Sequence, residues 1–396
     1  MQTTIERGKS VFMETYAQFP LVLTGGEGRY VFDNQGNRYL DMVAGIAVNV
    51  LGYHDTGLTE ALHQVVDKGL LHCSNLYWNE YAVEAAEQLV KLSGMERVFF
   101  CNSGTEANEG ALKLVRKYGS SKDPHHTDII TMKQSFHGRT YGSMTATGQL
   151  KYQQAFHPLV PGFSYVPFND FDALRAQVTD HTCAIFIEPV QGEGGVIPAD
   201  ETYLKQVRDL CDQHDILLVF DEVQCGMGRT GYPFAWQKYH VQPDVMTLAK
   251  ALGGGVPIGA VVTSGKASSV LQPGDHAATF GGNLLATAAS SHVLKRLAEG
   301  SLLRQVNTVS AALRSSLEAL RQQFPQILEI RGAGLMLGVQ MSIPVRPILE
   351  QCMKEGLILA NAGPEVLRFV PPLTLTADEA EEAVAILTHV LHQQLD

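Results

Sequence analysis

Residues 244–260 read DVMTLAKALGGGVPIGA, an apolar run of strand length that ends at Lys250 and is soon followed by Gly253, Gly254 and Gly255. A lysine at the end of such a run is costly to desolvate unless its charge is paired or its amine is used in chemistry. The glycines allow a tight turn and leave room beside the amine. The stretch therefore predicts a buried strand that delivers a functional lysine.

The surrounding sequence alternates short β-rich runs with amphipathic helices. The predicted strands cover residues 97–101, 128–132, 183–189, 216–223, 244–250 and 259–264. One intervening segment, residues 200–215, places on a single helical face Tyr203, Leu204, Val207, Leu210 and Cys211. This alternation predicts a largely parallel sheet covered by helices.

A smaller α+β domain is predicted at the C-terminal end. A long helical segment is followed by strands within 327–341, 356–361 and 366–372 and by a closing helix over 377–395. Near the N-terminus, Gln35, Gly36 and Asn37 indicate a hairpin. We expect an N-terminal segment, residues 1–50, that packs with the small domain, a large domain, residues 51–285, and a small domain, residues 286–396.

Composition favours a water-soluble enzyme. The 396 residues are 45% hydrophobic and 18% charged, the net charge is −11, and no basic stripe marks a nucleic-acid surface. The opening residues lack the apolar core of a signal peptide, and no run approaches the roughly 18 apolar residues of a membrane span. We expect a cytoplasmic protein without nucleic-acid or membrane partners.

Cysteine and histidine usage indicates no metal site. The six cysteines form no CxxC pair and are not interleaved with histidines at zinc spacing, and no HExxH occurs. We expect reduced, mostly structural cysteines.

Charged residues end three of the predicted strands: Glu188, Asp221 and Lys250. In an open α/β sheet, ligands collect at the carboxyl ends of the strands. A lysine that forms a Schiff base, facing an aspartate that keeps a pyridine nitrogen protonated, is the arrangement that pyridoxal phosphate requires. The alternative is an ordinary strand-end salt bridge between Asp221 and Lys250.

A phosphate site is predicted where the run FFCNSGTEANEG, residues 99–110, passes from strand to helix. Ser103, Gly104 and Thr105 stand where free amide groups and the helix dipole attract an anion. The alternative is a capping box formed by Ser103 and Glu106, and both interpretations can hold together. The run is neither a Walker loop nor a Rossmann fingerprint.

In their order and spacing, several strings of the chain resemble the class III pyridoxal-phosphate aminotransferases. They are NSGTEANE (102–109), SFHGRT (135–140), EPVQGEGG (188–195), DEVQCGMGRTG (221–231), the opening stretch, TFGGN (279–283) and LRFVPPL (367–373). The resemblance covers nearly the whole chain. It implies fold type I, with a mostly parallel seven-stranded sheet flanked by helices in the large domain and a smaller α+β C-terminal domain.

For the cofactor, pyridoxal 5′-phosphate, the resemblance implies a role for each matching residue. Lys250 would form the Schiff base, Asp221 would pair with the pyridine nitrogen, and Gln224 would bind the phenolic oxygen. Val223 and Phe136 would cover the two faces of the ring, although core packing is the alternative for Phe136.

The phosphate and the assembly follow from the same resemblance. Ser103, Gly104 and Thr105 would hold the phosphate together with Thr279 of a second subunit, and Glu188 also belongs to the cofactor site. A site shared between chains implies a homodimer.

Five residues are implied for the substrates. Arg139 would clamp the carboxylate of the acylated substrate, because its planar fork matches a carboxylate. Arg368 would grip the α-carboxylate of glutamate and 2-oxoglutarate, and Glu193 would neutralise Arg368 when the other substrate is bound. Tyr16 and Ile46 would complete the pocket; Ile46 replaces a tyrosine that enzymes for free ornithine present. The alternative for an arginine on a strand is a solvated surface charge.

The strings at 44–55, 71–80 and 165–175 are most similar to class members that act on acetylornithine. The resemblance therefore implies amino transfer from N2-acetyl-L-ornithine to 2-oxoglutarate, for arginine biosynthesis. Alternatives are succinylornithine, ornithine or 4-aminobutyrate as substrate, an aminomutase of the same fold, and a non-catalytic binding protein. Cys225 and Leu284 depart from the residues common in the family, which concerns local loop geometry.

Overall fold

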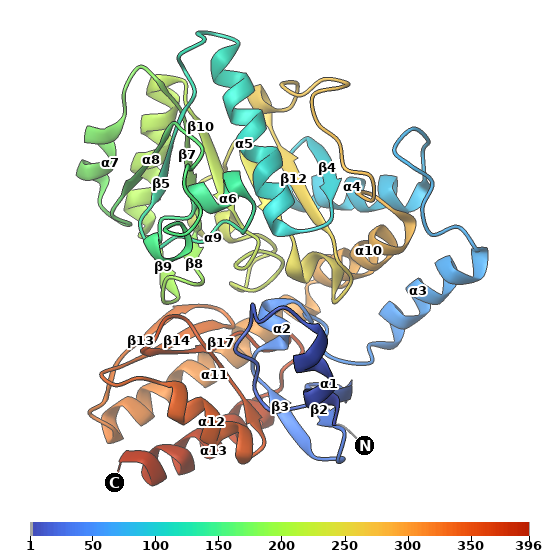
Figure 1. Cartoon of the computed structure of the whole chain (residues 1–396), viewed down its shortest axis with the longest axis vertical. Coiled ribbons are helices and arrows are strands. Elements are labelled where there is room, and N and C mark those ends of the chain that lie inside the picture. The colour runs from blue at the N-terminus through green and yellow to red at the C-terminus, as the bar shows by residue number, and fades with distance from the viewer. Residues whose placement is uncertain (1–2, 396) are drawn as a thin grey trace.

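The computed structural model describes residues 3–395 and divides into a large and a small layered body (Figure 1). The large body contains a seven-stranded sheet in the order β4-β12-β11-β10-β7-β5-β6, in which only β12 runs antiparallel to its neighbours. Its strands are β4 Arg97–Cys101, β5 Asp128–Met132, β6 Phe163–Val166, β7 Thr182–Ile187, β10 Leu217–Asp221, β11 Val245–Leu248 and β12 Gly259–Thr263. The predicted fold class is confirmed.

Helices cover both faces of this sheet (Figure 1). They are α4 Glu80–Ser93, α5 Gly104–Ser120, α6 Tyr141–Ala146, α7 Phe171–Gln177, α8 Glu201–His214, α9 Ala235–Tyr239 and α10 Leu284–Ala298. A further helix, α3 Thr56–Lys68, packs against α10 and projects to the side of the sheet (Figure 1). Short 3₁₀ turns lie at Leu150–Tyr152, Lys250–Gly253 and Gly265–Ala267, and a two-stranded ribbon is formed by β8 Val190–Gln191 and β9 Ile197–Pro198. The five residues expected on one face of α8 are all buried, as its periodicity predicts.

The small body is built around a second sheet, in the order β13-β14-β17-β16. Its elements are α11 Ser301–Gln323, β13 Ile327–Ala333, β14 Met336–Met341, α12 Arg346–Lys354, β15 Leu357–Ile358, β16 Ala360–Asn361, β17 Val366–Phe369 and α13 Ala377–Leu395. Residues 356–361, expected as one strand, form two, because β15 pairs with β3 and β16 pairs with β17. Residues 356–361 are divided because their two halves pair with strands of different sheets.

The N-terminal segment joins the small body. It comprises α1 Thr4–Val11, β1 Leu23–Glu27, β2 Tyr30–Asp33, β3 Arg38–Asp41 and α2 Ala44–Ala47. The expected hairpin is present, with β2 and β3 antiparallel, and β3 pairs in parallel with β15. The Arg29 guanidinium forms an ion pair with Glu379 at 2.5 Å, which ties this segment to α13.

The sheet places the predicted site at its edge nearest the small body. Glu188 directly follows β7, Asp221 ends β10, and Lys250 lies two residues after the end of β11; β10 lies between β7 and β11. Parallel strands bring their carboxyl ends to one edge, where ligands bind in such folds.

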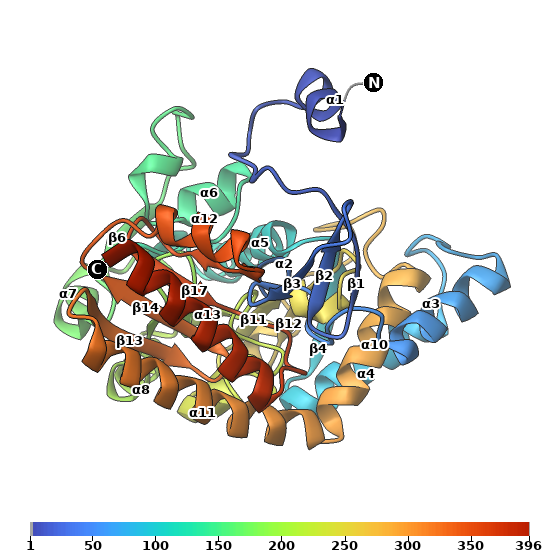
Figure 2. The same ribbon diagram turned by 90° about the horizontal axis from the view of Figure 1, so that it is seen from below.

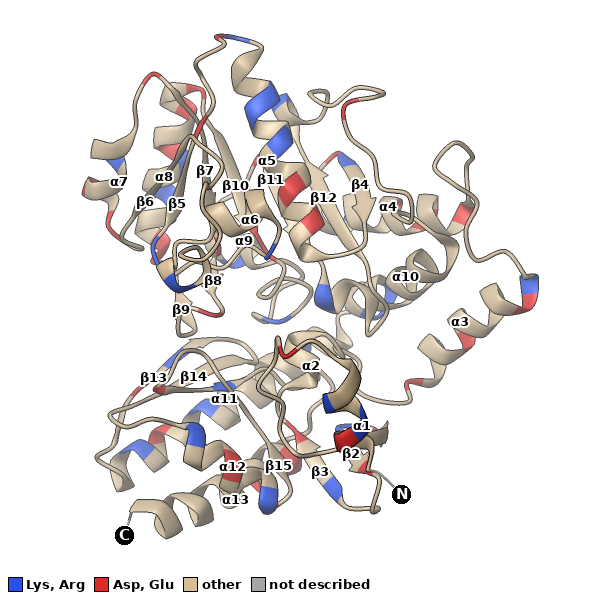
Figure 3. Ribbon diagram, viewed as in Figure 1, with Lys and Arg blue, Asp and Glu red and all other residues tan. Residues whose placement is uncertain are grey.

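Charges are spread over both bodies, with basic and acidic segments interspersed (Figure 3). In the described part of the chain, no helix is both long enough and apolar enough to cross a bilayer. Within residues 3–395, no group of three or more His, Cys, Asp or Glu side chains is placed to hold a metal ion.

Candidate active site

Lys250 begins a 3₁₀ turn, one residue beyond Ala249, which follows the buried strand β11. Its φ of 47° lies in the left-handed region that side chains rarely occupy, as happens at strained functional positions. Burial lowers the pKa of its amine to about 8. A substantial fraction of this amine is therefore neutral near physiological pH, which a nucleophile or a proton acceptor requires.

The amine faces a cavity of about 420 Å³. The cavity gathers ten of the residues that the sequence singles out: Ser103, Gly104, Thr105, Phe136, Arg139, Glu188, Asp221, Val223, Gln224 and Lys250. Arg368 and Glu193 reach the same place through Gln224, whose amide oxygen accepts a hydrogen bond from Arg368 at 3.1 Å and whose amide nitrogen donates to Glu193 at 3.2 Å. Twelve predicted residues from distant segments thus form one cluster.

Asp221 is held by two residues that the sequence interpretation did not include. One carboxylate oxygen lies 2.8 Å from His137 Nδ1 and accepts a hydrogen bond from the Asn108 amide at 2.7 Å. The other accepts from the Val223 backbone N–H at 3.0 Å. The salt bridge between Asp221 and Lys250, considered as the alternative, is not among the ion pairs of residues 3–395.

Both residues were within reach of sequence reasoning. His137 immediately follows Phe136 in the string SFHGRT, and Asn108 lies four positions after Gly104 on the predicted helix. Side chains four positions apart share a helix face, so a residue facing the same side as Gly104 was a candidate.

The cavity fits pyridoxal phosphate. Asn108 Oδ1 and His137 Nε2 are buried without a hydrogen-bond partner in the described structure, so polar capacity remains at the Asp221 wall. A Cβ on Gly104 would lie 2.7 Å from Val223 Cγ1, so only glycine leaves this space open. The N-terminus of α5 provides N–H groups without intrahelical acceptors, which suit a phosphate.

The expected capping box is only half formed. The Ser103 hydroxyl accepts a hydrogen bond from the Glu106 N–H at 3.3 Å, so Ser103 caps α5. The Glu106 carboxylate, however, accepts from the Asn102 backbone N–H at 2.6 Å and from its amide at 2.9 Å. A capping box would have Glu106 accept from the Ser103 backbone N–H; Glu106 instead bonds Asn102, one residue earlier in the chain.

Arg368 lies buried on β17 and pairs with Glu193. Burial alone would raise the pKa of Glu193, but the charge of Arg368, with Lys250 as a further cation, outweighs burial and lowers it. The pair therefore consists of two charged groups next to the Lys250 cavity. Breaking it would free a guanidinium for another carboxylate.

Glu188 lies buried in the wall of the cavity. Its carboxylate accepts hydrogen bonds from the backbone N–H groups of Phe136 at 3.0 Å and Gly192 at 3.2 Å. Burial raises its pKa. Glu188 thus connects the Phe136 segment to the turn that leads to Glu193.

Three predicted residues lie outside the cavity of this chain. Thr279 is exposed in the loop before α10 and lines a separate cavity of about 330 Å³. Tyr16, 79% exposed, lies in the segment after α1, which stands apart from the body (Figure 2). Ile46, 40% exposed, belongs to α2, and its neighbour Val48 lines the cavity instead.

The two departures from the family pattern occupy buried positions. The Cys225 thiol donates to the Asp221 carbonyl oxygen at 3.7 Å, and Leu284 begins α10 after the capping residue Asn283. All six cysteines are free thiols, and five are buried. Cys225 is thus bonded to the turn after β10, and Leu284 belongs to the first turn of a capped helix.

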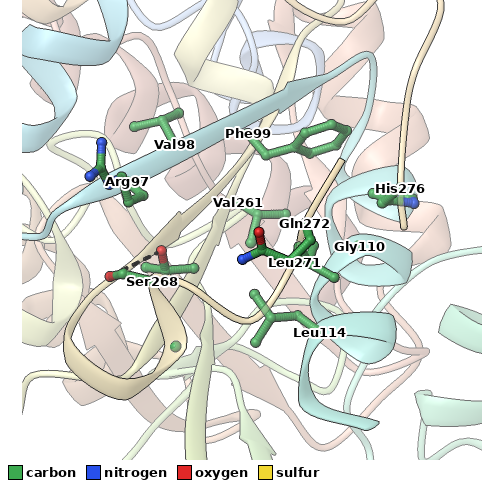
Figure 4. A pocket seen from close by; sticks show the side chains of 12 residues that line it. Arg97, Val98, Phe99, Gly110, Leu114, Val261, Ser268, Leu271, Gln272 and His276 are labelled. Carbon is green, nitrogen blue, oxygen red and sulfur yellow. Dashed lines mark hydrogen bonds between the residues drawn. The ribbon is translucent and has the colours of Figure 1, made fainter. Parts of the chain in front are cut away.

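A second cavity, of about 260 Å³, lies between β4, β12, α5 and the loop after β12 (Figure 4). Its wall combines apolar side chains such as Phe99 and Leu271 with Arg97, Gln272 and His276. It contains none of the predicted site residues.

Comparisons with known proteins show the family of the chain. A model of the family described as aminotransferase class-III matches residues 11–391. The chain is 49% identical over 387 residues to an acetylornithine aminotransferase of Caldanaerobacter subterraneus subsp. tengcongensis, covering 97% of this chain and 98% of that protein.

Two solved structures are similar over nearly their whole length. For the N-acetylornithine aminotransferase from Stenotrophomonas maltophilia K279a, the TM-score is 0.85 and the identity 40%, with 99% of each chain covered. For the ornithine aminotransferase from Toxoplasma gondii ME49, the TM-score is 0.94 and the identity 31%, with 98% of this chain and 94% of that chain covered. The backbone is thus shared by enzymes for different substrates.

Proposed function

The chain belongs to the class-III aminotransferases, which depend on pyridoxal phosphate, and from this premise we propose that it exchanges amino groups between N2-acetyl-L-ornithine and 2-oxoglutarate. When acetylornithine gives up its amino group, N-acetyl-L-glutamate 5-semialdehyde and L-glutamate are formed, and the reverse direction consumes these two compounds. The proposal includes a cytoplasmic homodimer that acts in arginine biosynthesis, in the direction that makes acetylornithine.

The pairing of Arg368 with Glu193 carries the proposal. Glutamate and 2-oxoglutarate bear a carboxylate on the reacting carbon, whereas the terminal amine of acetylornithine sits on a carbon without one. An unpaired buried guanidinium would be costly when acetylornithine is bound. A carboxylate that pairs with Arg368 and then releases it lets one site accept both substrates.

When bound, the cofactor supplies a carbonyl that takes up an amino group and a pyridinium ring that stabilises negative charge on the adjacent carbon. Asp221 would keep the pyridine nitrogen protonated, and His137 and Asn108 orient Asp221. Phe136 and Val223 would cover the ring, and Gln224 would bind its phenolic oxygen. Ser103, Gly104 and Thr105 would hold the phosphate.

Lys250 would both anchor the cofactor and move the proton. Its amine would take the proton from the substrate carbon that bears the nitrogen and deliver it to the cofactor carbon on the other side of that nitrogen, so that the nitrogen stays with the cofactor. The lowered pKa, about 8, suits this exchange, because proton transfer is most efficient when the group's pKa lies near the working pH.

Arg139 would bind the carboxylate at the end of the substrate that does not react. It lines the cavity and is exposed to it, so an acylated amino acid can reach its guanidinium. In the proposed dimer, Ile46, which lies outside the cavity of its own chain, would favour a neutral acyl amide over a free α-ammonium group, since an apolar side chain offers that charge no acceptor.

The substrate proposal is tested by measuring kcat/KM for N2-acetylornithine, ornithine and 4-aminobutyrate, with 2-oxoglutarate as acceptor, under one set of conditions. We expect acetylornithine to give the highest value. If ornithine or 4-aminobutyrate equals or exceeds it, the substrate assignment fails and the class-III aminotransferase assignment remains.

A further inference from the structure

The Arg139 guanidinium is positioned by aromatic rings. Its central carbon lies 4.2 Å from the centroid of the Tyr152 ring and 5.3 Å from that of Phe136. Among residues 3–395, the guanidinium has no hydrogen bond or ion pair with another protein group, and only the Arg139 backbone N–H is bonded, to Thr105 Oγ1. Nothing else in the described structure fixes the direction of this exposed cation.

The contact with rings has a chemical consequence. A guanidinium attracted to the π-face of a ring uses its charge and its own flat face, and its N–H donors remain available. Two parallel N–H donors are what a carboxylate needs for bidentate binding. The rings therefore hold Arg139 while leaving free the donors that a substrate would use.

Tyr152 is itself well anchored. It ends the 3₁₀ turn Leu150–Tyr152, and the next residue, the buried Gln153, donates from its amide to the carbonyl oxygens of Thr147 at 2.8 Å and Thr145 at 3.2 Å. The Tyr152 ring also meets the Phe136 ring edge-on, with 5.6 Å between centroids. Lys151 is exposed to solvent, and its ammonium group lies 4.8 Å from the centroid of the Tyr152 ring.

We propose that Tyr152 is a positioning residue that orders Arg139 for the substrate carboxylate, an inference that rests on the proposed function of this cavity. A long exposed arginine otherwise loses rotamer freedom when it binds a ligand, and that loss weakens binding. The Tyr152 ring restricts the rotamers of Arg139 already in the free enzyme, so that less freedom is lost when the substrate binds. Because the role belongs to the ring and not to the hydroxyl, phenylalanine should replace Tyr152.

A double-mutant cycle tests this coupling directly. The enzymes are wild type, Y152L, R139M and the double variant, assayed with N2-acetylornithine at saturating 2-oxoglutarate. We expect Y152L to raise KM about 3- to 30-fold, the range of a cation–π contact, with kcat within about 2-fold. In the R139M background, measured as kcat/KM at low substrate, Y152L should change the value by less than about 2-fold.

Three further variants complete the design. Y152F should restore the wild-type KM, and Y141L, which removes a nearby 59% exposed tyrosine that is not among the rings stacked on Arg139, should leave it unchanged. Y152Q, also non-aromatic, replaces Y152L if the leucine variant does not fold. An equal loss from Y152L with and without Arg139, or the same loss in Y152F, would overturn the proposal.

Failure of the substrate assignment can be told apart from failure of the positioning role of Tyr152. If the wild-type enzyme prefers ornithine or 4-aminobutyrate, the cycle is run with that substrate, since each bears a carboxylate away from the reacting amine. Coupling between Tyr152 and Arg139 then supports the positioning role independently of the acyl group, and its absence contradicts that role.

Discussion

At Lys250, the fold combines two costs that the surrounding structure must offset: a left-handed backbone and a partly buried, desolvated amine. The strand β11 and the turn after it fix the backbone, while the neighbouring Glu193 favours the charged amine and opposes part of the effect of burial. The result is an amine that is reactive near neutral pH. An exposed lysine, with a pKa near 10.4, would not be.

We therefore predict that purified apoprotein attaches pyridoxal phosphate through Lys250, at a rate proportional to the fraction of the Lys250 amine that is neutral. The rate should rise between about pH 7 and pH 9 and level off above, because the pKa is lowered to about 8. Absorbance of the attached cofactor gives the rate, and K250A, the control, should not attach it. A rise that continues to pH 10.5, or borohydride-fixed cofactor on another lysine, would contradict the assignment.

At the scale of elements, Glu222 joins β10 to α9. Its carboxylate is buried and accepts hydrogen bonds from the backbone N–H groups of Ala235 at 2.6 Å and Trp236 at 2.7 Å. Burial raises its pKa to about 8. The element junction beside Asp221 is therefore held by a carboxyl group that keeps its proton in the folded state at neutral pH.

This junction gives stability a predictable pH dependence. The folded pKa of about 8 exceeds the ordinary 4.5, so the folded state binds more protons than the unfolded state between these values. The stabilising contribution is complete below about pH 4.5 and is lost as pH rises through 8. E222Q mimics the protonated group and lacks this change.

We expect the stability of wild type relative to E222Q to be greater at pH 5.5 than at pH 8, by on the order of 1–3 kcal/mol. Urea unfolding of both proteins at the two pH values measures this difference. E350Q, at an exposed position on α12, serves as the control and should show no such difference. A difference that is equal at both pH values would refute the role of Glu222.

At the scale of the whole molecule, large apolar side chains are exposed on the loop that carries Thr279 and on the loop between α3 and α4. Leu76, Tyr77, Trp78 and Phe280 are between 61% and 94% exposed. The loop between α3 and α4 is joined to the loop before α10 by the Asn75 amide, which donates to the Ala278 carbonyl oxygen at 2.9 Å. Large exposed apolar side chains on two adjoining loops favour a protein interface, and they support the proposed homodimer.

We predict that W78K disrupts this assembly and lowers activity, because a lysine in the centre of an apolar interface would be desolvated without a partner. Sedimentation should show a shift toward monomer, and the loss of activity should lessen as protein concentration rises. L328K, which changes a 50% exposed leucine on β13, should alter neither. A dimeric, fully active W78K would place the interface elsewhere.

The sequence alone determined the alternating architecture and the strand-end positions of Glu188, Asp221 and Lys250, because hydrophobic periodicity and glycine placement act over a few residues. It missed β6, a four-residue edge strand followed at once by Pro167. It also read residues 356–361 as one strand. Short elements carry too little periodicity for local reasoning, and their partners decide them.

Only the tertiary structure decided how the site is completed. His137 and Asn108 meet Asp221 across 84 and 113 residues of chain, and Arg368 meets Glu193 across 175. Tyr152 acquires its place over Arg139 from a turn fixed by the buried Gln153. Hydrogen bonds and ring contacts depend on distances of a few ångströms, and those distances are set by packing of whole elements rather than by the preferences of neighbouring residues.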